Sequence, residues 1–192
     1  MARTKAFDRD EALQGALDTF RVKGFEATSI QELVAGMGIN RQSIYDTFGD
    51  KEALYHAALE RYLELNRASM ATLLEGPEPL RRALATLFGW AIDHLVAKGG
   101  LPCFLAQAAL ERGADSPASA VCVKAAFGEN LRRMETRLRR AQAEGELGPH
   151  HDPAALARMF QNTLHGLQVT FRSGASREDL EAIVRVTLSV LG

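Results

Sequence analysis

Three consecutive polar residues, Arg41, Gln42 and Ser43, follow Asn40. They begin a short stretch in which apolar residues recur at the spacing of a helix. An arginine side chain can donate two hydrogen bonds to the edge of guanine, and a glutamine can pair in a similar way with adenine. Backbone N–H groups in the first turn of a helix also attract phosphate. These residue types in this order therefore predict a helix whose N-terminal end recognises nucleic acid.

Two further side chains near this stretch could bind phosphate. Tyr45 supplies a phenol donor and Lys51 supplies an ammonium group. Contacts of this kind fix a protein on a duplex without reading its sequence. Arg3 and Lys5 could add a short basic arm before the first helix. The alternative for Tyr45 and Lys51 is a half-buried aromatic ring and a solvated helix start.

Two short helices joined by a glycine-containing turn would position these side chains. The first helix begins with Thr28 to Glu32, which has the pattern of a capping box, and it ends at Gly36 to Gly38. Asn40 can then cap the second helix. The small Ala35 can let the two helices approach, and apolar residues can fix the angle between them: Ile30, Leu33, Val34, Ile39, Ile44 and Phe48. The pattern predicts a helix-turn-helix. A generic helical hairpin with a polar face is the alternative, since short matches to this motif are common.

Residues Phe20 to Ile30 and Gly38 to Leu54 resemble, nearly position by position, the DNA-binding domain of tetracycline-repressor (TetR) family regulators. The resemblance implies a transcriptional regulator, not an enzyme. It would act as a repressor that binds a palindromic operator in double-stranded DNA as a homodimer and is released by a small-molecule inducer. The DNA contacts that the resemblance implies are Thr28, Ser29, Arg41, Gln42, Ser43, Tyr45 and Lys51.

Position 46 departs from the family pattern. Many members have a histidine there, and this chain has Asp46. A carboxylate is repelled by phosphates. The side chain could accept from a cytosine amine, cap another group or point away from DNA, and the sequence leaves these roles open.

The composition excludes several classes of protein. The 192 residues carry a formal net charge of -1, so no overall positive charge attracts a polyanion, and positive charge has to be segregated to the DNA-facing side. No stretch approaches the roughly 18 apolar residues of a membrane span. Cys103 and Cys122 have neither the spacing of a disulfide framework nor that of a zinc site. We expect a cytoplasmic protein without a metal, another cofactor or a membrane partner.

Helix start and stop signals recur along the whole chain, whereas alternating runs of β-branched residues are missing, which predicts an all-α fold. The first helix should begin after Asp8 and stop at Gly24. We expect an N-terminal helix-turn-helix domain over residues 1–51, a linking helix over 50–74, and a C-terminal helical domain over 52–192. The later helices expected are 80–98, 103–112, 117–144, 153–173 and 177–191. The arginine-rich run from Asn130 to Arg140 is interpreted as a solvated face.

The resemblance implies that the C-terminal domain binds the ligand and forms the dimer through its last two helices. Both helices carry an apolar stripe: Leu156, Met159, Thr163, Gly166, Leu167 and Thr170, then Leu180, Ile183, Val184, Thr187 and Leu188. Such stripes can also pack within one chain. The candidates for the ligand pocket are Trp90, His94, Cys103, Phe104, Gln107, Phe127, Phe160 and His165. Each of them could instead be core packing.

Residues Gly99 to Glu111 resemble a stretch of one TetR subgroup, in which a cysteine, here Cys103, follows a glycine-containing turn. Some members of that subgroup sense electrophiles or oxidants through this cysteine. A helix start favours the reactive thiolate. The alternative is that Cys103 packs as a small buried hydrophobic residue. The chain departs from the subgroup at Pro102, where the subgroup has glycine.

Two hypotheses lie outside the family. One is an all-helical enzyme using His94, His165 or Cys103, and the other is a module that binds protein. The sequence contains no catalytic motif that would support an enzyme. Neither hypothesis explains why the second helix of the motif begins with polar side chains such as Arg41.

Overall fold

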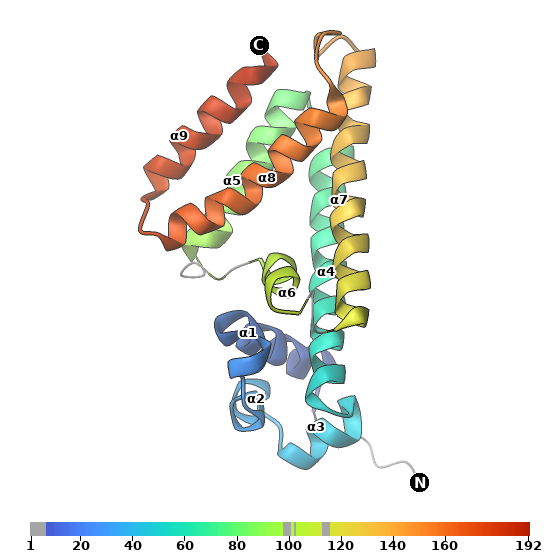
Figure 1. The fold of residues 1–192 in the computed structure, drawn as a ribbon, viewed down its shortest axis with the longest axis vertical. Coiled ribbons are helices and arrows are strands. Elements are labelled where there is room, and N and C mark those ends of the chain that lie inside the picture. Colours follow the sequence, from blue (N-terminus) through green and yellow to red (C-terminus); the bar gives the residue numbers. More distant parts are fainter. Residues whose placement is uncertain (1–6, 98–100, 102, 113–115) are drawn as a thin grey trace. The chain divides into compact units, whose positions relative to one another are not determined.

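The structure, a computed structural model, describes residues 7–97, 101, 103–112 and 116–192. Within these ranges the chain forms helices joined by turns and contains no strand, which confirms the predicted all-α fold (Figure 1). Arg3, Lys5 and Pro102 lie outside the described residues. No helix in the described part of the chain has the length and apolar character needed to cross a membrane.

Contacts between residues divide the chain into two compact units, and each is described by itself. Unit 1 comprises Met1–Leu65 and Phe104–Val123, and unit 2 comprises Asn66–Cys103 and Lys124–Gly192. The division passes through two long helices, α4 (Lys51–Glu75) and α7 (Pro117–Ala143). The domain boundary expected after residue 51 stays a prediction.

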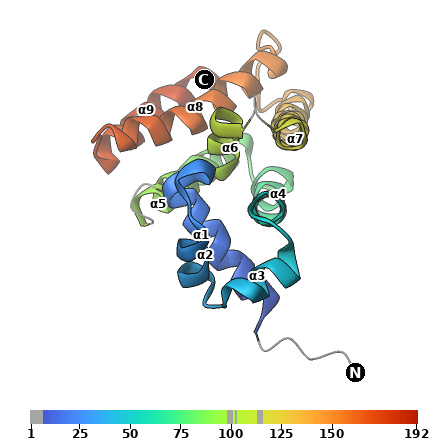
Figure 2. The ribbon, with the colours of Figure 1, turned by 60° about the horizontal axis from the view of Figure 1, so that its bottom comes forward.

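Unit 1 holds the N-terminal helices, the start of α4, the helix α6 and the start of α7. The helices that lie wholly in this unit are α1 (Arg9–Ala27), α2 (Ile30–Met37), α3 (Arg41–Phe48) and α6 (Phe104–Arg112). Helices α2 and α3 are the two members of the predicted helix-turn-helix, and Figure 2 shows them beside α1.

Capping side chains begin these helices where the sequence predicts them. The Asp8 carboxylate accepts hydrogen bonds from the backbone N–H groups of Asp10 and Glu11. Ser29 and Glu32 form a complete capping box at the start of α2. These bonds satisfy N–H groups that have no partner inside the helix.

Helix α1 is interrupted at Gly24, where the sequence predicts its end. Gly24 has φ +82° and ψ 177°, a conformation that is essentially limited to glycine. The chain then resumes a helical course to Ala27. The helix-stop pattern thus identifies the interruption and misses the turn that follows it.

Helices α1 and α2 approach so closely that their backbones touch. A Cβ atom added to Gly15 would stand 2.2 Å from the carbonyl oxygen of Gly36, and one added to Gly36 would stand 2.2 Å from Oγ1 of Thr19. Only glycine leaves room for this crossing. Ala35, which we expected to let helices approach, is exposed, so that expectation is wrong.

An aromatic cluster fills the centre of unit 1. The Tyr55 ring lies edge-on to Phe20, Phe25 and Phe104, at centroid distances of 5.1, 5.2 and 5.1 Å. Burial raises the pKa of the Tyr55 phenol above its usual range, and the nearby Glu111 carboxylate raises it further. The cluster joins α1, α4 and α6 into one core.

Unit 2 contains the remaining helices. Those that lie wholly in this unit are α5 (Leu80–Ala97), α8 (Pro153–Arg172) and α9 (Arg177–Leu188), followed by a 3₁₀ turn (Ser189–Leu191). Their starts agree with the predicted ones. The main difference is that the last α-helix ends at Leu188, where we expected it to reach residue 191.

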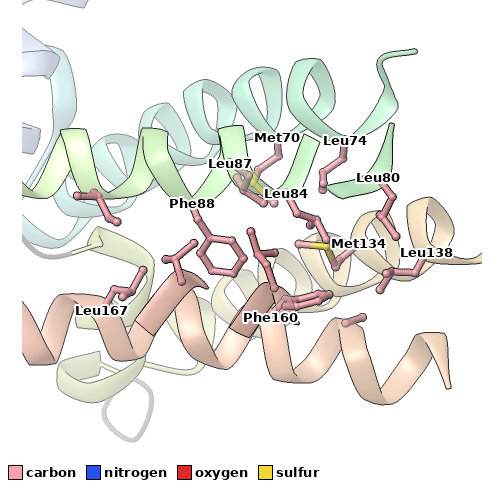
Figure 3. Close-up of a cluster of buried hydrophobic side chains, with 14 of the residues drawn as sticks. Met70, Leu74, Leu80, Leu84, Leu87, Phe88, Met134, Leu138, Phe160 and Leu167 are labelled. Atoms are coloured by element: carbon pink, nitrogen blue, oxygen red, sulfur yellow. The ribbon is translucent and has the colours of Figure 1, made fainter. Parts of the chain in front are cut away.

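The core of unit 2 lies between the second half of α4 and the helices α5, α7, α8 and α9. The Phe88 ring of α5 meets the Phe160 ring of α8 edge-on at 6.1 Å, and Met134 and Leu138 of α7 belong to the same buried cluster (Figure 3). Removing this apolar surface from water is the main stabilising contribution to such a bundle.

The arginine-rich part of α7 is only partly the solvated face that we expected. Arg139 pairs with Glu135 on the surface, in agreement with that interpretation. Arg137 is buried and donates to the carbonyl oxygen of Glu78 at 2.7 Å, and Arg140 donates to that of Gly76, also at 2.7 Å. These two arginines therefore hold the turn between α4 and α5, a role that charge patterning alone does not reveal.

Candidate nucleic-acid interface

Helix α3 presents the side chains that the sequence predicts to read bases. Asn40 Oδ1 accepts a hydrogen bond from a backbone N–H of the first turn at 2.8 Å and so fixes the helix start. Ile44 and Phe48 are buried on the inner side of the helix, whereas Arg41 and Gln42 are exposed. The helix therefore packs its apolar side inward and keeps a polar side on the surface.

Two side-chain pairs run along this polar side, each between residues four positions apart. Arg41 Nη2 lies 3.4 Å from Tyr45 Oη, and its guanidinium carbon lies 5.6 Å from the centre of the Tyr45 ring. Gln42 Nε2 donates to Asp46 Oδ1 at 2.8 Å. Residues with this spacing are neighbours on a helix surface. The structure thus brings together Arg41, Gln42 and Tyr45, with Asp46 among them.

Lys51 and Ser29 lie near the surface and interact with neighbours in unit 1. Lys51 Nζ is 3.4 Å from the backbone carbonyl oxygen of Glu26 and 4.4 Å from the centre of the Phe25 ring. The Ser29 hydroxyl donates to Glu32 Oε2 at 2.9 Å. The Ser29 hydroxyl would have to exchange Glu32 for a phosphate, whereas the Lys51 ammonium group has two further donors.

Glu32 is held as a carboxylate at the start of α2. The Lys23 ammonium group beside it, together with the N–H and hydroxyl groups of Ser29, lowers the pKa of Glu32 from an ordinary 4.5 to about 2. An ionised carboxylate at this end of a helix is favourable because backbone N–H groups point toward it.

Thr28 and Ser43 are less exposed than the other predicted DNA contacts. Thr28 is 1% exposed, and its hydroxyl donates to the backbone carbonyl oxygen of Gly24. Ser43 is half-buried. Contacts from these two residues to DNA stay predictions.

Sequence reasoning missed a polar anchor between α1 and α6. Glu111 Oε2 accepts from the backbone N–H of Phe25 at 3.0 Å, and Gln107 Nε2 donates to Oε1 of the same carboxylate at 3.0 Å. Gly24 makes room for it, because a Cβ atom there would stand 2.3 Å from Glu111 Oε1. The only signal in the sequence was Gly24 itself, which we interpreted as a helix stop.

Arg112 extends this anchor to α4. Its guanidinium group donates to Glu26 at 3.2 Å and to Glu52 at 3.0 Å, and it lies 4.2 Å from the centre of the Phe25 ring. The Arg112 side chain is 8% exposed, and a guanidinium so deeply buried needs such partners. One side chain therefore holds the segments that precede α2 and follow α3.

The candidates for the ligand pocket fall into both compact units. Phe104 and Gln107 belong to unit 1, and the others belong to unit 2: Trp90, His94, Cys103, Phe127, Phe160 and His165. Phe104 and Phe160 are completely buried in the cores of their own units, and Cys103 is half-buried. A pocket that includes all of them stays a prediction.

Two pairs of these candidates are in contact within unit 2. The rings of Trp90 and His94 have centroids 4.2 Å apart, and His94 Nδ1 lies 3.0 Å from the Trp90 carbonyl oxygen. His165 lies edge-on to Phe127 at 5.1 Å, and burial lowers its pKa. His165 Nδ1 is buried and has no hydrogen-bond partner among the residues that the structure describes, so it is a polar atom that a ligand could satisfy.

A separate open groove of about 480 Å³ lies between α5 and α9 in unit 2. It contains none of the predicted pocket residues and is lined by Arg81, Ala85, Gly89, Ile92, Glu181, Val184, Arg185 and Leu188.

Only part of each predicted apolar stripe on α8 and α9 is exposed. Leu167, Leu180, Val184 and Leu188 pack in the core of unit 2, as the intrachain alternative predicts. The exposed residues of small or apolar type on these helices and the following turn include Gly166, Val169, Ile183, Val186 and Val190. Exposed apolar groups gathered on one element often mark an interaction surface.

Comparison with known proteins places this arrangement in a family. Residues 12–58 match the family model described as "Bacterial regulatory proteins, tetR family". Residues 76–187 match "Tetracyclin repressor-like, C-terminal domain". The two matches cover both the helix-turn-helix and most of the remaining chain.

Relatives are similar over nearly the full length. The HTH-type transcriptional repressor ComR of Escherichia coli (strain K12) is 34% identical over 97% of this chain and 90% of its own length. The uncharacterized HTH-type transcriptional regulator YezE of Bacillus subtilis (strain 168) is 32% identical over 100% of both chains. A cysteine mutant of the TetR family transcriptional regulator CifR, solved with 26-bp operator DNA, has a TM-score of 0.88 at 34% identity and covers 99% of this chain and 100% of its own. The chain therefore belongs to the TetR family of bacterial regulatory proteins.

Proposed function

We propose that this chain is a transcriptional repressor that binds a palindromic operator as a homodimer and is released by a small-molecule inducer. The observation that carries this function is the exposed polar side of α3, fixed by Asn40 in a capped helix-turn-helix. ComR, a relative at 34% identity, is itself a transcriptional repressor. The CifR mutant, also at 34% identity, was solved with operator DNA.

The predicted DNA contacts divide by chemistry. Arg41 and Gln42 read base edges in the major groove, because their side chains can pair with guanine and adenine. Tyr45 and Lys51 hold phosphates. The remaining contacts, Thr28, Ser29 and Ser43, rest on the family resemblance alone.

The dimer forms through α8 and α9, where Val169 and Val186 are 68% and 72% exposed in the single chain. A two-fold dimer presents two α3 helices to two half-sites related by the same symmetry. Residues 1–51 would then bind DNA, and residues 52–192 would bind the ligand and the second chain. Such a regulator works in the cytoplasm, where its operator is.

The test is selection of duplexes from a random library by the full-length protein, followed by footprinting and light scattering. We expect an inverted repeat whose half-site centres lie one helical turn or a small multiple apart, about 34–36 Å per turn. A single unrepeated half-site, or a monomer at micromolar concentration, would contradict this function. The DNA that flanks the gene is the first natural sequence to search for the selected repeat.

Release would occur when a ligand prefers the state that does not bind DNA. A tenfold loss of operator affinity needs a preference of only about 1.4 kcal/mol. We propose α4, continuous from Lys51 to Glu75, as the element that carries the signal.

Cys103 as a sensor of electrophiles stays a prediction, and N-ethylmaleimide tests it. A loss of operator affinity that Cys103→Ser abolishes would assign the thiol to release, because serine is nearly isosteric and a poor nucleophile. Unchanged affinity in the wild-type protein would leave reversible ligand binding as the route.

A further inference from the structure

The pair formed by Gln42 and Asp46 gives the polar side of α3 a fixed donor and acceptor pattern. Gln42 Nε2 donates to Asp46 Oδ1 at 2.8 Å, and both side chains are exposed one helical turn apart. Asn40 caps the same first turn, so the backbone that carries Gln42 is also fixed. Asp46, whose role the sequence leaves open, thus contacts the side-chain amide of Gln42.

The chemistry of this pair decides which way round the Gln42 amide lies. An ionised carboxylate only accepts hydrogen bonds, whereas the two ends of a glutamine amide differ, because the NH₂ group donates and the oxygen accepts. Only the Nε2 end of Gln42 can therefore face Asp46. Turning the amide over would place Oε1 against a carboxylate oxygen, so Asp46 removes one of the two orientations that an unpaired glutamine can adopt.

This orientation matters for reading bases in the major groove. Adenine offers a donor at N6 and an acceptor at N7, which match Oε1 and the second N–H of Gln42, whereas guanine offers two acceptors, O6 and N7. A glutamine whose amide is free to turn can direct both N–H donors of its NH₂ group at O6 and N7 of guanine. In a glutamine held by Asp46 one of these donors is engaged and Oε1 faces guanine O6, and the lost hydrogen bond disfavours guanine.

We propose that Asp46 is a positioning residue for sequence specificity: it holds the Gln42 amide so that α3 selects adenine over guanine at one position of each half-site. This inference rests on the proposed function of α3 as the reader of an operator. Asp46 also brings a negative charge near the phosphates and so weakens binding to every duplex. Removing that charge should therefore raise non-specific affinity and reduce discrimination together.

The test compares Asp46→Asn with Asp46→Glu in the full-length protein. Asparagine has the size of aspartate, but its amide both donates and accepts, so Gln42 can turn over. Glutamate remains a carboxylate that only accepts. Circular dichroism and thermal unfolding should be unchanged in both variants, because position 46 is exposed. The probes are the duplex selected by the wild-type protein and the same duplex with the selected A·T pair changed to G·C.

We expect the wild type and Asp46→Glu to prefer the A·T duplex by about tenfold or more, and Asp46→Asn by no more than about threefold. Asp46→Asn should also bind a random duplex more tightly than the wild type does. In a Gln42→Ala background the preference should be lost, and Asp46→Asn should then leave the ratio of the two affinities unchanged while still raising both of them, since only the preference acts through the contact with Gln42.

Three outcomes overturn the inference. An undiminished preference in Asp46→Asn, with operator binding intact, overturns it and leaves the proposed function standing. A preference for adenine that survives Gln42→Ala also overturns the inference and leaves the proposed function standing. A wild-type protein that selects no sequence at all overturns the proposed function together with the inference.

Discussion

The carboxylate of Glu111 accepts a hydrogen bond from the backbone N–H of Phe25 at 3.0 Å, although the two residues are 86 positions apart. The next residue, Arg112, bonds to Glu26 and Glu52. Helix α6 therefore contributes to the placement of the helix-turn-helix, in addition to the apolar core that α1, α2 and α3 share.

Replacing Arg112 by alanine should lower the free energy of unfolding by about 1–3 kcal/mol, because a buried charged network loses its centre. The larger losses in unfolding free energy that follow the breaking of fully buried ion pairs do not apply here. The side chains of Glu26 and Glu52 are 77% and 50% exposed. Urea denaturation followed by circular dichroism measures the change. Arg82→Ala is the control, because Arg82 pairs with Glu78 at 76% exposure and should cost less than about 0.5 kcal/mol. Equal effects would refute the role of Arg112.

Gly24→Ala should destabilise the protein by about 1–3 kcal/mol. The new Cβ would stand 2.3 Å from Glu111 Oε1, at a φ of +82° that an alanine resists. Thermal unfolding should show a lower midpoint. Gly89→Ala, in the middle of α5 with open space around it, should instead be neutral or stabilising by up to about 1 kcal/mol. A neutral Gly24→Ala variant would contradict both the backbone conformation at position 24 and the placement of Glu111 beside it.

Glu32→Gln should change how stability depends on pH. The folded-state pKa of Glu32, about 2, lies below the ordinary value of 4.5. The stabilisation is therefore complete above the unfolded-state pKa and is lost as the pH falls from about 4.5 toward 2. Midpoints measured across this range should fall less steeply for Glu32→Gln than for the wild type. Glu64→Gln, an exposed change in the middle of α4, should retain the wild-type slope, and identical slopes in all three proteins would exclude the effect.

Lys51→Ala and Arg41→Ala should weaken DNA binding in different ways. Loss of a phosphate contact lowers the affinity for all sequences alike and reduces the slope of log K against log salt by about one unit. Loss of a base contact costs about 1–3 kcal/mol at one position and relaxes the preference there. Fluorescence anisotropy with the selected duplex and its single-base variants, at several salt concentrations, separates the two. Equal changes in specificity would refute this division of roles.

Val186→Glu should convert the dimer into a monomer at micromolar concentration, because a charge would be buried at the proposed interface of α9. Val121→Glu on α7 is a matched control, since Val121 is 71% exposed and Val186 is 72% exposed in the single chain. Sedimentation velocity should show a dimer for the control and a monomer for Val186→Glu. A dimer in both would move the interface away from this face of α9.

The helix starts and the polar side of α3 could be predicted because their signals are local. Ser29 and Asn40 are capping residues within three positions of the N–H groups they bind, and Gly24 marks a backbone that other residues avoid. The exposure of Arg41 and Gln42 follows from the period of a helix whose opposite side is apolar.

The anchor on α6 could not be predicted, because its partners are distant in sequence. Nothing near Arg112 distinguishes it from the surface arginines of α7. Charge patterning likewise predicts a solvated Arg137, although this side chain is buried. The same limit applies to Thr28, which has the residue type of a DNA contact and bonds to Gly24 inside unit 1. Burial of a polar side chain depends on tertiary packing, which a periodic pattern describes only for apolar residues.

The contact between Gly15 and Gly36 bears on how much variation an operator could tolerate. Where the backbones of Gly15 and Gly36 meet, neither residue has a side chain that could give way, which favours movement of the helix-turn-helix as a rigid body. One extra base pair between half-sites displaces the second half-site by about 3.4 Å and turns it by about 35°. A rigid helix-turn-helix cannot absorb that error by itself, so the adjustment would fall on the elements that connect the two DNA-binding units, α4 and the proposed dimer contact among them. We therefore expect the spacer length of the operator to be fixed more strictly than many of its bases.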